Sequence, residues 1–246
     1  MTALALLLAR RGSKGVPRKN LREICGKPCL CWTLDDAVRA REAGAVDRIA
    51  LSSDDSELLN IGENCGIDTL DRPADLAGDD TSIDDAARHA ITSLNDPQIN
   101  AIVILYGNVP VRPSDLIERA VTLYRETGCD SVQSYAPVGK YHPWWTAVVD
   151  VQGAGAVRPW EGATLNHGVY RRQDLPPAHI PDGGVLVVSR ESLFCQHKGV
   201  APGPHAFLGR DHRGILTAQG EVLDIDCELD LIVAERMLER RLGAVR

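Results

Sequence analysis

The sequence lacks any long hydrophobic run. No apolar stretch approaches the roughly 20 residues that a helix needs to cross a bilayer. The short apolar run at residues 4–9 precedes Arg10 and Arg11 instead of following them, which is not the arrangement of a secretory signal. An excess of positive charge is also missing: the net charge is −7, whereas nucleic-acid-binding domains are usually basic. We therefore expect a cytoplasmic protein that binds neither membranes nor nucleic acid.

Several familiar motifs are absent as well. The seven cysteines are an odd number and are scattered, so we expect no disulfide framework. Cys25, Cys29 and Cys31 have no second pair at zinc spacing, which predicts reduced, mostly buried thiols near the start of a helix. The P-loop pattern fails because residues 26–28 read Gly-Lys-Pro, and neither Gly-x-Gly-x-x-Gly nor Gly-x-Ser-x-Gly follows a predicted strand.

The chain does contain a regular alternation of short apolar runs and helical periodicity. The predicted strands are Leu4–Ala9, Arg48–Ser52, Ala101–Tyr106, Ser131–Tyr135, Gly184–Val188 and Glu221–Ile225. Apolar residues at i, i+3, i+4 and i+7 around 30–38 and 116–124 predict helices, and a last helix is expected at about 228–242. This alternation predicts one α/β domain over residues 1–246, with a doubly wound, mostly parallel sheet covered by helices on both faces.

The alternation breaks at residues 138–182, which hold three of the four tryptophans and five prolines. Two short alternating runs, 145–151 and 156–160, are separated by Gly153 and Gly155, and this pattern predicts a β-hairpin. Exposed aromatic residues on such a hairpin need a partner surface. We interpret the segment as an inserted dimerisation arm of a homodimer; a lid over the active site is the alternative.

A cluster of positive charge follows the first predicted strand. Seven basic side chains and one acidic side chain lie between Arg10 and Lys27, against the acidic background of the chain. Gly12 and Gly15 allow a tight turn whose backbone N–H groups can approach a ligand closely. A cationic, glycine-containing turn after a buried strand is typical of phosphate binding, and the alternative is a solvated basic loop.

Two aspartates near the carboxyl end form the second signal. Asp224 and Asp226 are two residues apart, so on a strand their side chains would point to the same face. Two neighbouring carboxylates repel each other unless a cation lies between them or one is protonated. A Mg²⁺ ion bound by the two carboxylates and by substrate phosphates would remove this repulsion. The acid pair together with the basic turn favours phosphoryl or nucleotidyl transfer. In the alternative interpretation, Asp226 caps the final helix.

With these motifs in place, the chain resembles the CMP-sialic acid synthetases, or acylneuraminate cytidylyltransferases, over nearly its whole length. The matching segments, in order, are residues 9–15 with Lys19-Asn20, 72–77, 80–82, 110–112, 142–143, 172–177 and 224–231. The resemblance implies a GT-A-like, Rossmann-type nucleotidyltransferase fold and a homodimer. It also implies Mg²⁺-dependent transfer of CMP from CTP to an acidic sugar, with release of pyrophosphate.

The resemblance also assigns roles by position. Arg10, Ser13, Lys14 and Lys19 resemble the residues that hold the triphosphate; Asn20, Arg72 and Ser82 resemble those that contact cytidine; Asp224 and Asp226 match the metal pair. Of these, Arg10, Lys19 and Asp226 are expected to carry catalysis.

The acceptor side departs from the family pattern. Tyr106 stands where a glutamine contacts the sugar, Trp145 where a lysine often lies, and Asp182 where an asparagine precedes Gly183. An aspartate would repel an anionic acceptor, or it could receive an ammonium group or a hydroxyl. Arg172 is the candidate for gripping a carboxylate; the alternative is a surface pair with Asp174.

Other interpretations stay open at this stage. His142, His167 or His179 could act as general base, but each is expected to be an ordinary hydrogen-bonded or interface histidine. The acceptor could be a phosphonate or another non-sialic molecule. The Asp-x-Asp pattern also resembles that of glycosyltransferases that use nucleotide sugars, and a non-catalytic dimeric nucleotide-binding module is a third alternative.

Overall fold

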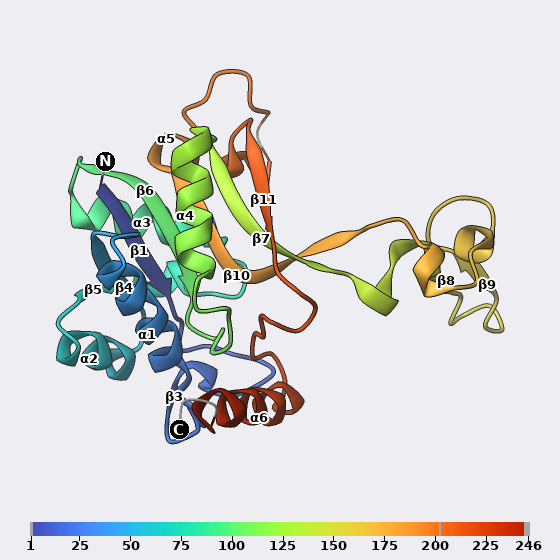
Figure 1. The fold of residues 1–246 in the computed structure, drawn as a ribbon, viewed down its shortest axis with the longest axis horizontal. Coiled ribbons are helices and arrows are strands. Elements are labelled where there is room, and N and C mark those ends of the chain that lie inside the picture. Colours follow the sequence, from blue (N-terminus) through green and yellow to red (C-terminus); the bar gives the residue numbers. More distant parts are fainter. Residues whose placement is uncertain (1, 202, 244–246) are drawn as a thin grey trace.

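The computed structural model describes residues 2–201 and 203–243. A seven-stranded sheet in the order β11-β7-β10-β6-β1-β4-β5 forms its centre (Figure 1). β10 runs antiparallel to both of its neighbours, β6 and β7, and the other pairings in this sheet are parallel. The predicted mostly parallel, doubly wound α/β fold is confirmed.

The strands of the main sheet are β1 (Thr2–Leu8), β4 (Arg48–Ser53), β5 (Asp68–Asp71), β6 (Ile99–Tyr106), β7 (Ser131–Pro137), β10 (His179–Ser189) and β11 (His212–Leu216). Two small ribbons pair β2 (Glu23–Ile24) with β3 (Lys27–Pro28), and β8 (Ala147–Val149) with β9 (Val157–Pro159). The helices are α1 (Cys29–Glu42), α2 (Ser56–Asn64), α3 (Ile83–Leu94), α4 (Leu116–Thr127), α5 (Arg190–Leu193) and α6 (Glu228–Gly243). Short 3₁₀ turns include η1 (Lys19–Leu21) and η7 (Ala206–Leu208).

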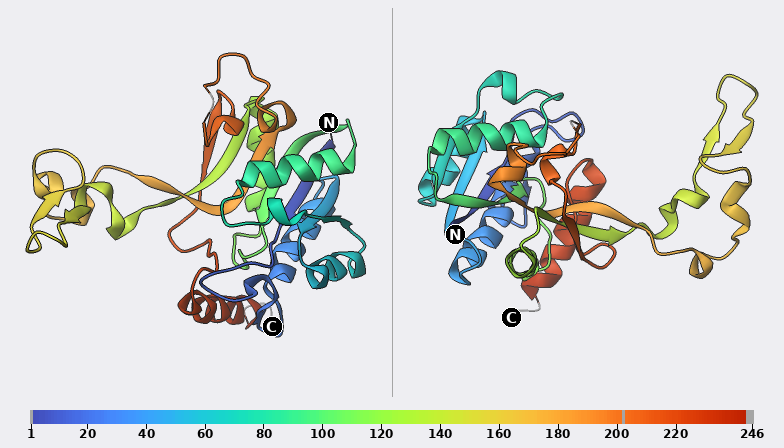
Figure 2. Two further views of the ribbon diagram at one scale, coloured as in Figure 1. Left: turned by 180° about the vertical axis from the view of Figure 1, so that it is seen from behind. Right: turned by 90° about the horizontal axis from the view of Figure 1, so that it is seen from above.

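Helices cover the sheet on both faces because its central strands are apolar on both sides (Figures 1 and 2). In β1, Ala3, Ala5 and Leu7 pack into one core with residues of α1, α2 and α4. Leu4 and Leu6 point the other way, into a second core with residues of α3, α5 and η7. Successive strand residues alternate between faces, so a continuous apolar run must be buried on both sides.

One predicted strand is wrong. Residues 221–225 do not join the sheet; Leu223 makes an isolated bridge to Val111. The backbone bonds of this segment go instead to the loop after β6: Leu223 N donates to Val111 O at 3.1 Å and Ile225 N donates to Asn108 O at 2.8 Å. The chain therefore passes the edge of the sheet at which the parallel strands end before α6 begins.

A third apolar cluster holds α6 against the basic loop. Val16 and Ile24 of the loop, Ile225, and Leu231 and Leu238 of α6 are buried together. Gly15 brings the two segments into contact, because a Cβ at that position would lie 1.9 Å from the carbonyl oxygen of Asp226. The fold thus joins the two charged motifs, which are more than 200 residues apart in sequence.

The segment between β7 and β10 projects far from the sheet as an arm (Figures 1 and 2). Its stem is the outer part of the β7–β10 pair, where His179 lies opposite Pro137. The predicted hairpin is confirmed as β8 and β9, although it is shorter than the alternating runs suggested. Aromatic side chains remain exposed on the arm, with Trp160 at 64% and Tyr170 at 89% of full exposure.

Candidate active site

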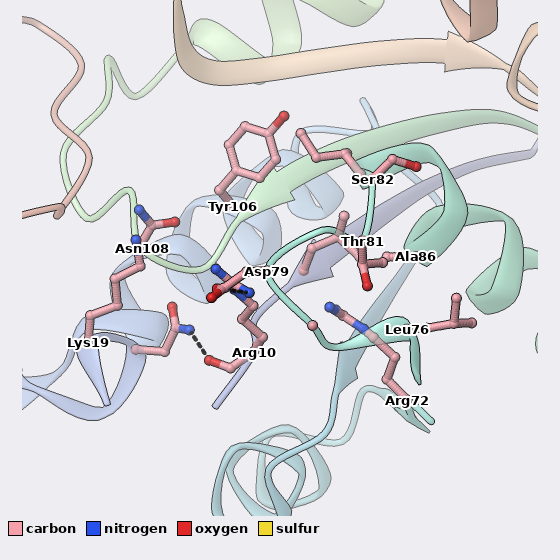
Figure 3. Close-up of a pocket in the computed structure, with 14 residues that line it drawn as sticks. Arg10, Lys19, Arg72, Leu76, Asp79, Thr81, Ser82, Ala86, Tyr106 and Asn108 are labelled. Atoms are coloured by element: carbon pink, nitrogen blue, oxygen red, sulfur yellow. Dashed lines mark hydrogen bonds and ion pairs between the residues drawn. The ribbon is translucent and has the colours of Figure 1, made fainter. Parts of the chain in front are cut away.

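A cavity of 240 Å³ lies at the carboxyl ends of β1, β5 and β6 (Figure 3). Its polar walls come from separate elements: Arg10 follows β1, Arg72 follows β5, and Asn108 follows β6. Ser82 lies at the N-cap of α3, where its Oγ accepts a hydrogen bond from the Asp85 N–H. Parallel strands end at one edge of a sheet, so these loops converge there.

Of the four residues predicted to hold a triphosphate, Arg10 and Lys19 line this cavity. Ser13 and Lys14 lie outside its lining, but Lys14 reaches back to its rim. Sequence reasoning missed Asp79, whose carboxylate pairs with Arg10 Nη1 at 2.8 Å and with Lys14 Nζ at 2.7 Å. Hydrogen bonds from Lys14 and then Arg10 lower the pKa of Asp79, so this carboxylate binds the cations in its ionised form.

Two of the predicted cytidine contacts are fixed in buried positions. Asn20 is 3% exposed; its Nδ2 donates to Arg10 O at 2.9 Å, and its Oδ1 has no partner among the described residues. Arg72 is held by Ser52, because its Nε donates to Ser52 Oγ at 3.1 Å and its Nη2 to Ser52 O at 2.7 Å. Burial lowers the pKa of Arg72. A buried amide oxygen without a donor and a fixed guanidinium are suited to a polar planar ligand.

The two aspartates are brought together without a strand. Burial raises the pKa of Asp224, and the neighbouring Asp226 carboxylate, which shares a hydrogen bond with it, raises this pKa further. Lys19 Nζ lies 2.9 Å from Asp226 Oδ1, so the acids adjoin the cationic cavity.

Asp230, in the first turn of α6, holds the two residues that precede the helix. Its Oδ2 accepts from the N–H of Asp226 at 2.9 Å and from that of Cys227 at 2.7 Å. The Asp226 carboxylate contacts Lys19 Nζ, and among the described residues no hydrogen bond joins it to an N–H of α6. Asp55 caps α2, accepting from the Glu57 N–H at 3.0 Å.

Comparison with known proteins shows to which family the chain belongs. The profile of the cytidylyltransferases matches residues 4–198. The chain belongs to the cytidylyltransferase family. It is 30% identical over 196 residues to the N-acylneuraminate cytidylyltransferase of Streptococcus agalactiae serotype III (strain NEM316), a match that covers 79% of this chain and 45% of that relative. The chain thus spans less than half the length of that relative.

Other relatives match over a larger share of their length. The chain is 26% identical to the CMP-N,N'-diacetyllegionaminic acid synthase of Legionella pneumophila, with 97% of each covered. A structure of CMP-2-keto-3-deoxy-manno-octonic acid synthetase complexed with CTP superposes with a TM-score of 0.71 at 15% identity, covering 98% of this chain and all of that one. The 4-diphosphocytidyl-2C-methyl-D-erythritol synthase of Anaerococcus prevotii gives 0.62 at 14% identity, covering 97% and 98%. These likenesses confirm the nucleotidyltransferase fold.

The carboxylate pair of Asp224 and Asp226 could hold a magnesium ion. Mg²⁺ is commonly held by one or two carboxylates, with substrate phosphates and water completing its octahedron. Asp224, whose ionised form is disfavoured by its neighbour, gains from a shared cation. Within residues 2–201 and 203–243, no cluster of three or more His, Cys, Asp or Glu side chains is arranged to bind a metal. Two carboxylates supply only part of an octahedron, so substrate phosphates or water would complete it.

A second cavity of 510 Å³ adjoins the first, and Thr81, Ser82, Ile83 and Tyr106 line both. The remaining lining comes from β7, β10 and the segment around η7: Gln133, Tyr135, Pro181, Leu186, Pro204, His205, Phe207 and Leu208, together with Asp84 of α3. Burial raises the pKa of Tyr106 to about 12, so its phenol is neutral. Of the four residues predicted to contact the acceptor, Tyr106 lines this cavity.

Asp182 has a structural role in this fold. Its Oδ1 accepts hydrogen bonds from Ser134 Oγ and from the Gly184 N–H, and its Oδ2 accepts from Thr217 Oγ1 at 2.6 Å. These contacts fix the irregular start of β10, and Asp182 lines neither cavity. The sequence did not signal this network, because its members lie in three separate segments.

Trp145 and Arg172 lie on the arm, and neither lines a cavity of its own chain. Trp145 Nε1 donates to Val169 O at 3.1 Å. Arg171, rather than Arg172, pairs with Asp174, at 2.7 Å.

The arm histidines also have local roles. His142 accepts from the Trp144 N–H and contacts Pro176 O at 3.1 Å. The His167 ring stacks on Trp144, with ring centroids 4.7 Å apart. His179 begins β10, on the stem of the arm. All seven cysteines are free thiols; Cys29 is buried, whereas Cys25 and Cys31 are half-buried. In the part of the chain described, no helix has the length and apolar character of a membrane span.

Proposed function

We propose that this chain transfers CMP from CTP to an acidic sugar, an acylneuraminate or a related 3-deoxy-ulosonate, and releases pyrophosphate. The observation that carries the proposal is the 2.9 Å contact between Lys19 and Asp226, which joins the basic loop to the acid pair beside the cavity. The curated names of the streptococcal and Legionella relatives support the reaction type.

Each group of residues has a separate role in the proposed reaction. Arg10 and Lys19 bind the triphosphate, and Lys14 reaches its far end. The amide of Asn20 and the guanidinium of Arg72 orient cytidine at the buried side of the cavity. Asp224 and Asp226 would hold Mg²⁺, which neutralises charge on the phosphates. These preorganised charges stabilise the transferred group and the departing pyrophosphate more strongly in the transition state than in the ground state.

The acceptor enters the second cavity. Its described lining holds one carboxylate, Asp84, and no lysine or arginine, so a sugar acid needs a cation from elsewhere. We propose a homodimer in which the arm packs against a second copy and brings Trp145 and Arg172 toward the partner's cavity. The same observation favours a second candidate, CMP transfer to a non-sialic acceptor of lower charge. A glycosyltransferase or a non-catalytic module has no comparable support.

Release of pyrophosphate tests the proposal. Purified protein with CTP and Mg²⁺ is expected to release pyrophosphate with one or more nonulosonate acceptors, and Asp226→Asn is expected to lose most of this activity. Glu239→Gln on the outer surface of α6, paired with Arg236, is the matched control and retains it. Turnover only with neutral or phosphonate acceptors would favour the second candidate. Absence of CTP binding would overturn both.

A further inference from the structure

A hydrogen-bonded series of side chains that no role above uses begins at Tyr135, in the wall of the second cavity, and continues behind it through His212 to Ser131. Ser131, Gln133 and Tyr135 alternate along β7 and so share one face of the sheet, the face that carries α3 and η7. β11 pairs in parallel with β7, and His212 lies opposite Ser131. The edge strand β11 and its neighbour β7 therefore place a hydroxyl, an imidazole and a phenol in one row beside the cavity.

The hydrogen bonds in this row are donated in one direction, from Tyr135 through His212 and Ser131 to the carbonyl of Leu208. Ser131 Oγ donates its proton to Leu208 O at 2.5 Å, so it accepts from His212 Nδ1, which lies 2.7 Å away. These partners assign the proton of the neutral imidazole to Nδ1. His212 Nε2 then has a free lone pair and accepts from the Tyr135 hydroxyl at 2.9 Å, a shorter contact than the 3.3 Å between this hydroxyl and Gln133 Oε1. The Tyr135 hydroxyl oxygen keeps its own lone pairs for a ligand in the cavity.

A glycine permits this arrangement. Gly214 in β11 lies beside the Tyr135 ring, and a Cβ there would be 3.2 Å from Tyr135 Cδ2. The ring lies against the β11 backbone and meets the His212 ring edge-on, with centroids 6.1 Å apart. The tyrosine therefore connects the cavity to a histidine that is itself held by Ser131.

We propose that Tyr135 and His212 form a proton relay that activates the acceptor hydroxyl. The inference rests on the proposed CMP transfer. The acceptor oxygen forms a bond to the α-phosphorus of CTP, and the bond from that phosphorus to the bridging β-phosphate oxygen breaks, its electron pair leaving with pyrophosphate. The acceptor proton moves to Tyr135 Oη as the phenolic proton moves to His212 Nε2. The imidazolium then returns its proton to solvent. Tyr135 is the catalytic residue, and His212 and Ser131 are positioning residues.

The surroundings of the relay keep the imidazole neutral before the reaction. Burial, and then the charge of His205 across the cavity, lower the pKa of His212 from 6.5. On β11, the neighbouring Arg213 is paired with Asp211 at 2.9 Å. From β7, burial raises the pKa of Tyr135, so the phenol retains its proton at neutral pH. From α3, Asp84 reaches the cavity lining and pairs with Arg88 at 2.6 Å.

Three variants test the relay: Tyr135→Phe, His212→Gln and Ser131→Ala, each assayed for kcat, for the KM of CTP and for the pH dependence of kcat/KM. General-base catalysis contributes roughly 10²- to 10⁴-fold, so Tyr135→Phe is expected to lower kcat by that order with the KM of CTP unchanged.

The wild type loses activity as pH falls through a pKa below 6.5, because protonated His212 cannot accept a proton. For His212→Gln, kcat/KM is expected not to fall at acid pH (no acid limb), and its maximum value is expected to be lower than that of the wild type. Ser131→Ala, which loses only the contact that orients the imidazole, is expected to lower kcat less than His212→Gln and to keep the acid limb.

Two outcomes separate this inference from the proposed function. His89→Gln, on α3 and outside both cavities, is the matched histidine control and is expected to match the wild type. If the wild type transfers CMP but Tyr135→Phe and His212→Gln keep its kcat and its acid limb, the relay is overturned and the transfer stands. A variant that fails to fold is replaced by Gly214→Val, which displaces the Tyr135 ring and must reproduce the loss of kcat. If no acceptor supports turnover in the wild type, the proposed function fails instead.

Discussion

At the scale of single residues, the account depends on charges that are placed before any ligand arrives. Arg10 and Lys19 line one cavity; Arg10 contacts Asp79 there, and Lys19 contacts Asp226 beside it. Preorganised cations of this kind stabilise developing charge without a reorganisation cost during the reaction. Five of the seven residues that the family motifs grouped for nucleotide binding line one cavity: Arg10, Lys19, Asn20, Arg72 and Ser82. Their roles there stay a prediction. Asp79 was not predictable, because its loop carries several acids and only the fold selects one.

Lys19→Ala is expected to lower kcat by about two to three orders of magnitude, or roughly 2.7–4 kcal/mol, since it removes one contact to the transferred group. Steady-state pyrophosphate release measures the effect. Lys27→Ala is the matched control, because Lys27 belongs to the same basic segment but pairs with Asp35 outside the cavity. Equal losses in the two variants would mean that general positive charge, rather than Lys19, matters.

Asp79→Asn is expected to lower the KM for CTP by about two- to fivefold. The nucleotide must displace the Asp79 carboxylate from Arg10 and Lys14, and the effect is small because solvent screens exposed ion pairs. The control is Asp80→Asn, whose carboxylate makes no ion pair with the described residues. A higher KM for Asp79→Asn would show that this carboxylate assists nucleotide binding instead of competing with it.

At the scale of elements, packing brings the two motifs together. Val16 and Ile24 of the basic loop share a buried cluster with Ile225 and with Leu231 of α6. The sequence predicted that Asp224 and Asp226 point the same way, but assigned this to a strand. The segment in fact pairs with the loop at Asn108 and Val111, a contact between distant loops that local periodicity does not encode. The strands and long helices were predictable because their apolar spacing is local.

Gly15→Ala is expected to reduce CMP transfer while the protein stays folded. The added Cβ would lie 1.9 Å from the Asp226 carbonyl oxygen, so the loop and the acid pair must move apart. Activity assays together with circular dichroism measure the two effects. Gly12→Ala in the same loop meets no atom within 4 Å and is expected to behave like the wild type. Full activity in Gly15→Ala would contradict the proposed coupling of loop and acids.

At the scale of the whole molecule, the arm is the feature that one chain does not explain. It extends away from the sheet (Figure 1) and has exposed aromatic residues. Its residues Trp145 and Arg172 line neither of the two cavities. The sequence predicted the arm from its clustered tryptophans and prolines. It could not predict where the arm docks, because that depends on a second surface.

The double variant Trp160→Ser, Tyr170→Ser is expected to shift the protein from dimer to monomer, since large exposed aromatic residues dominate interface energies. Sedimentation velocity measures the change. Leu229→Ser on α6 is the matched control, because Leu229 and Trp160 are both 64% exposed. A wild-type monomer, or a double variant that remains dimeric, would contradict the proposed role of the arm.

The most direct test of the central claim is a crystal structure of the protein with CTP and Mg²⁺. The account predicts cytosine beside Asn20 and Arg72, the triphosphate against Arg10 and Lys19, and the metal ion bridging the phosphates and Asp226. A nucleotide bound elsewhere, or a triphosphate directed away from Asp224 and Asp226, would contradict it.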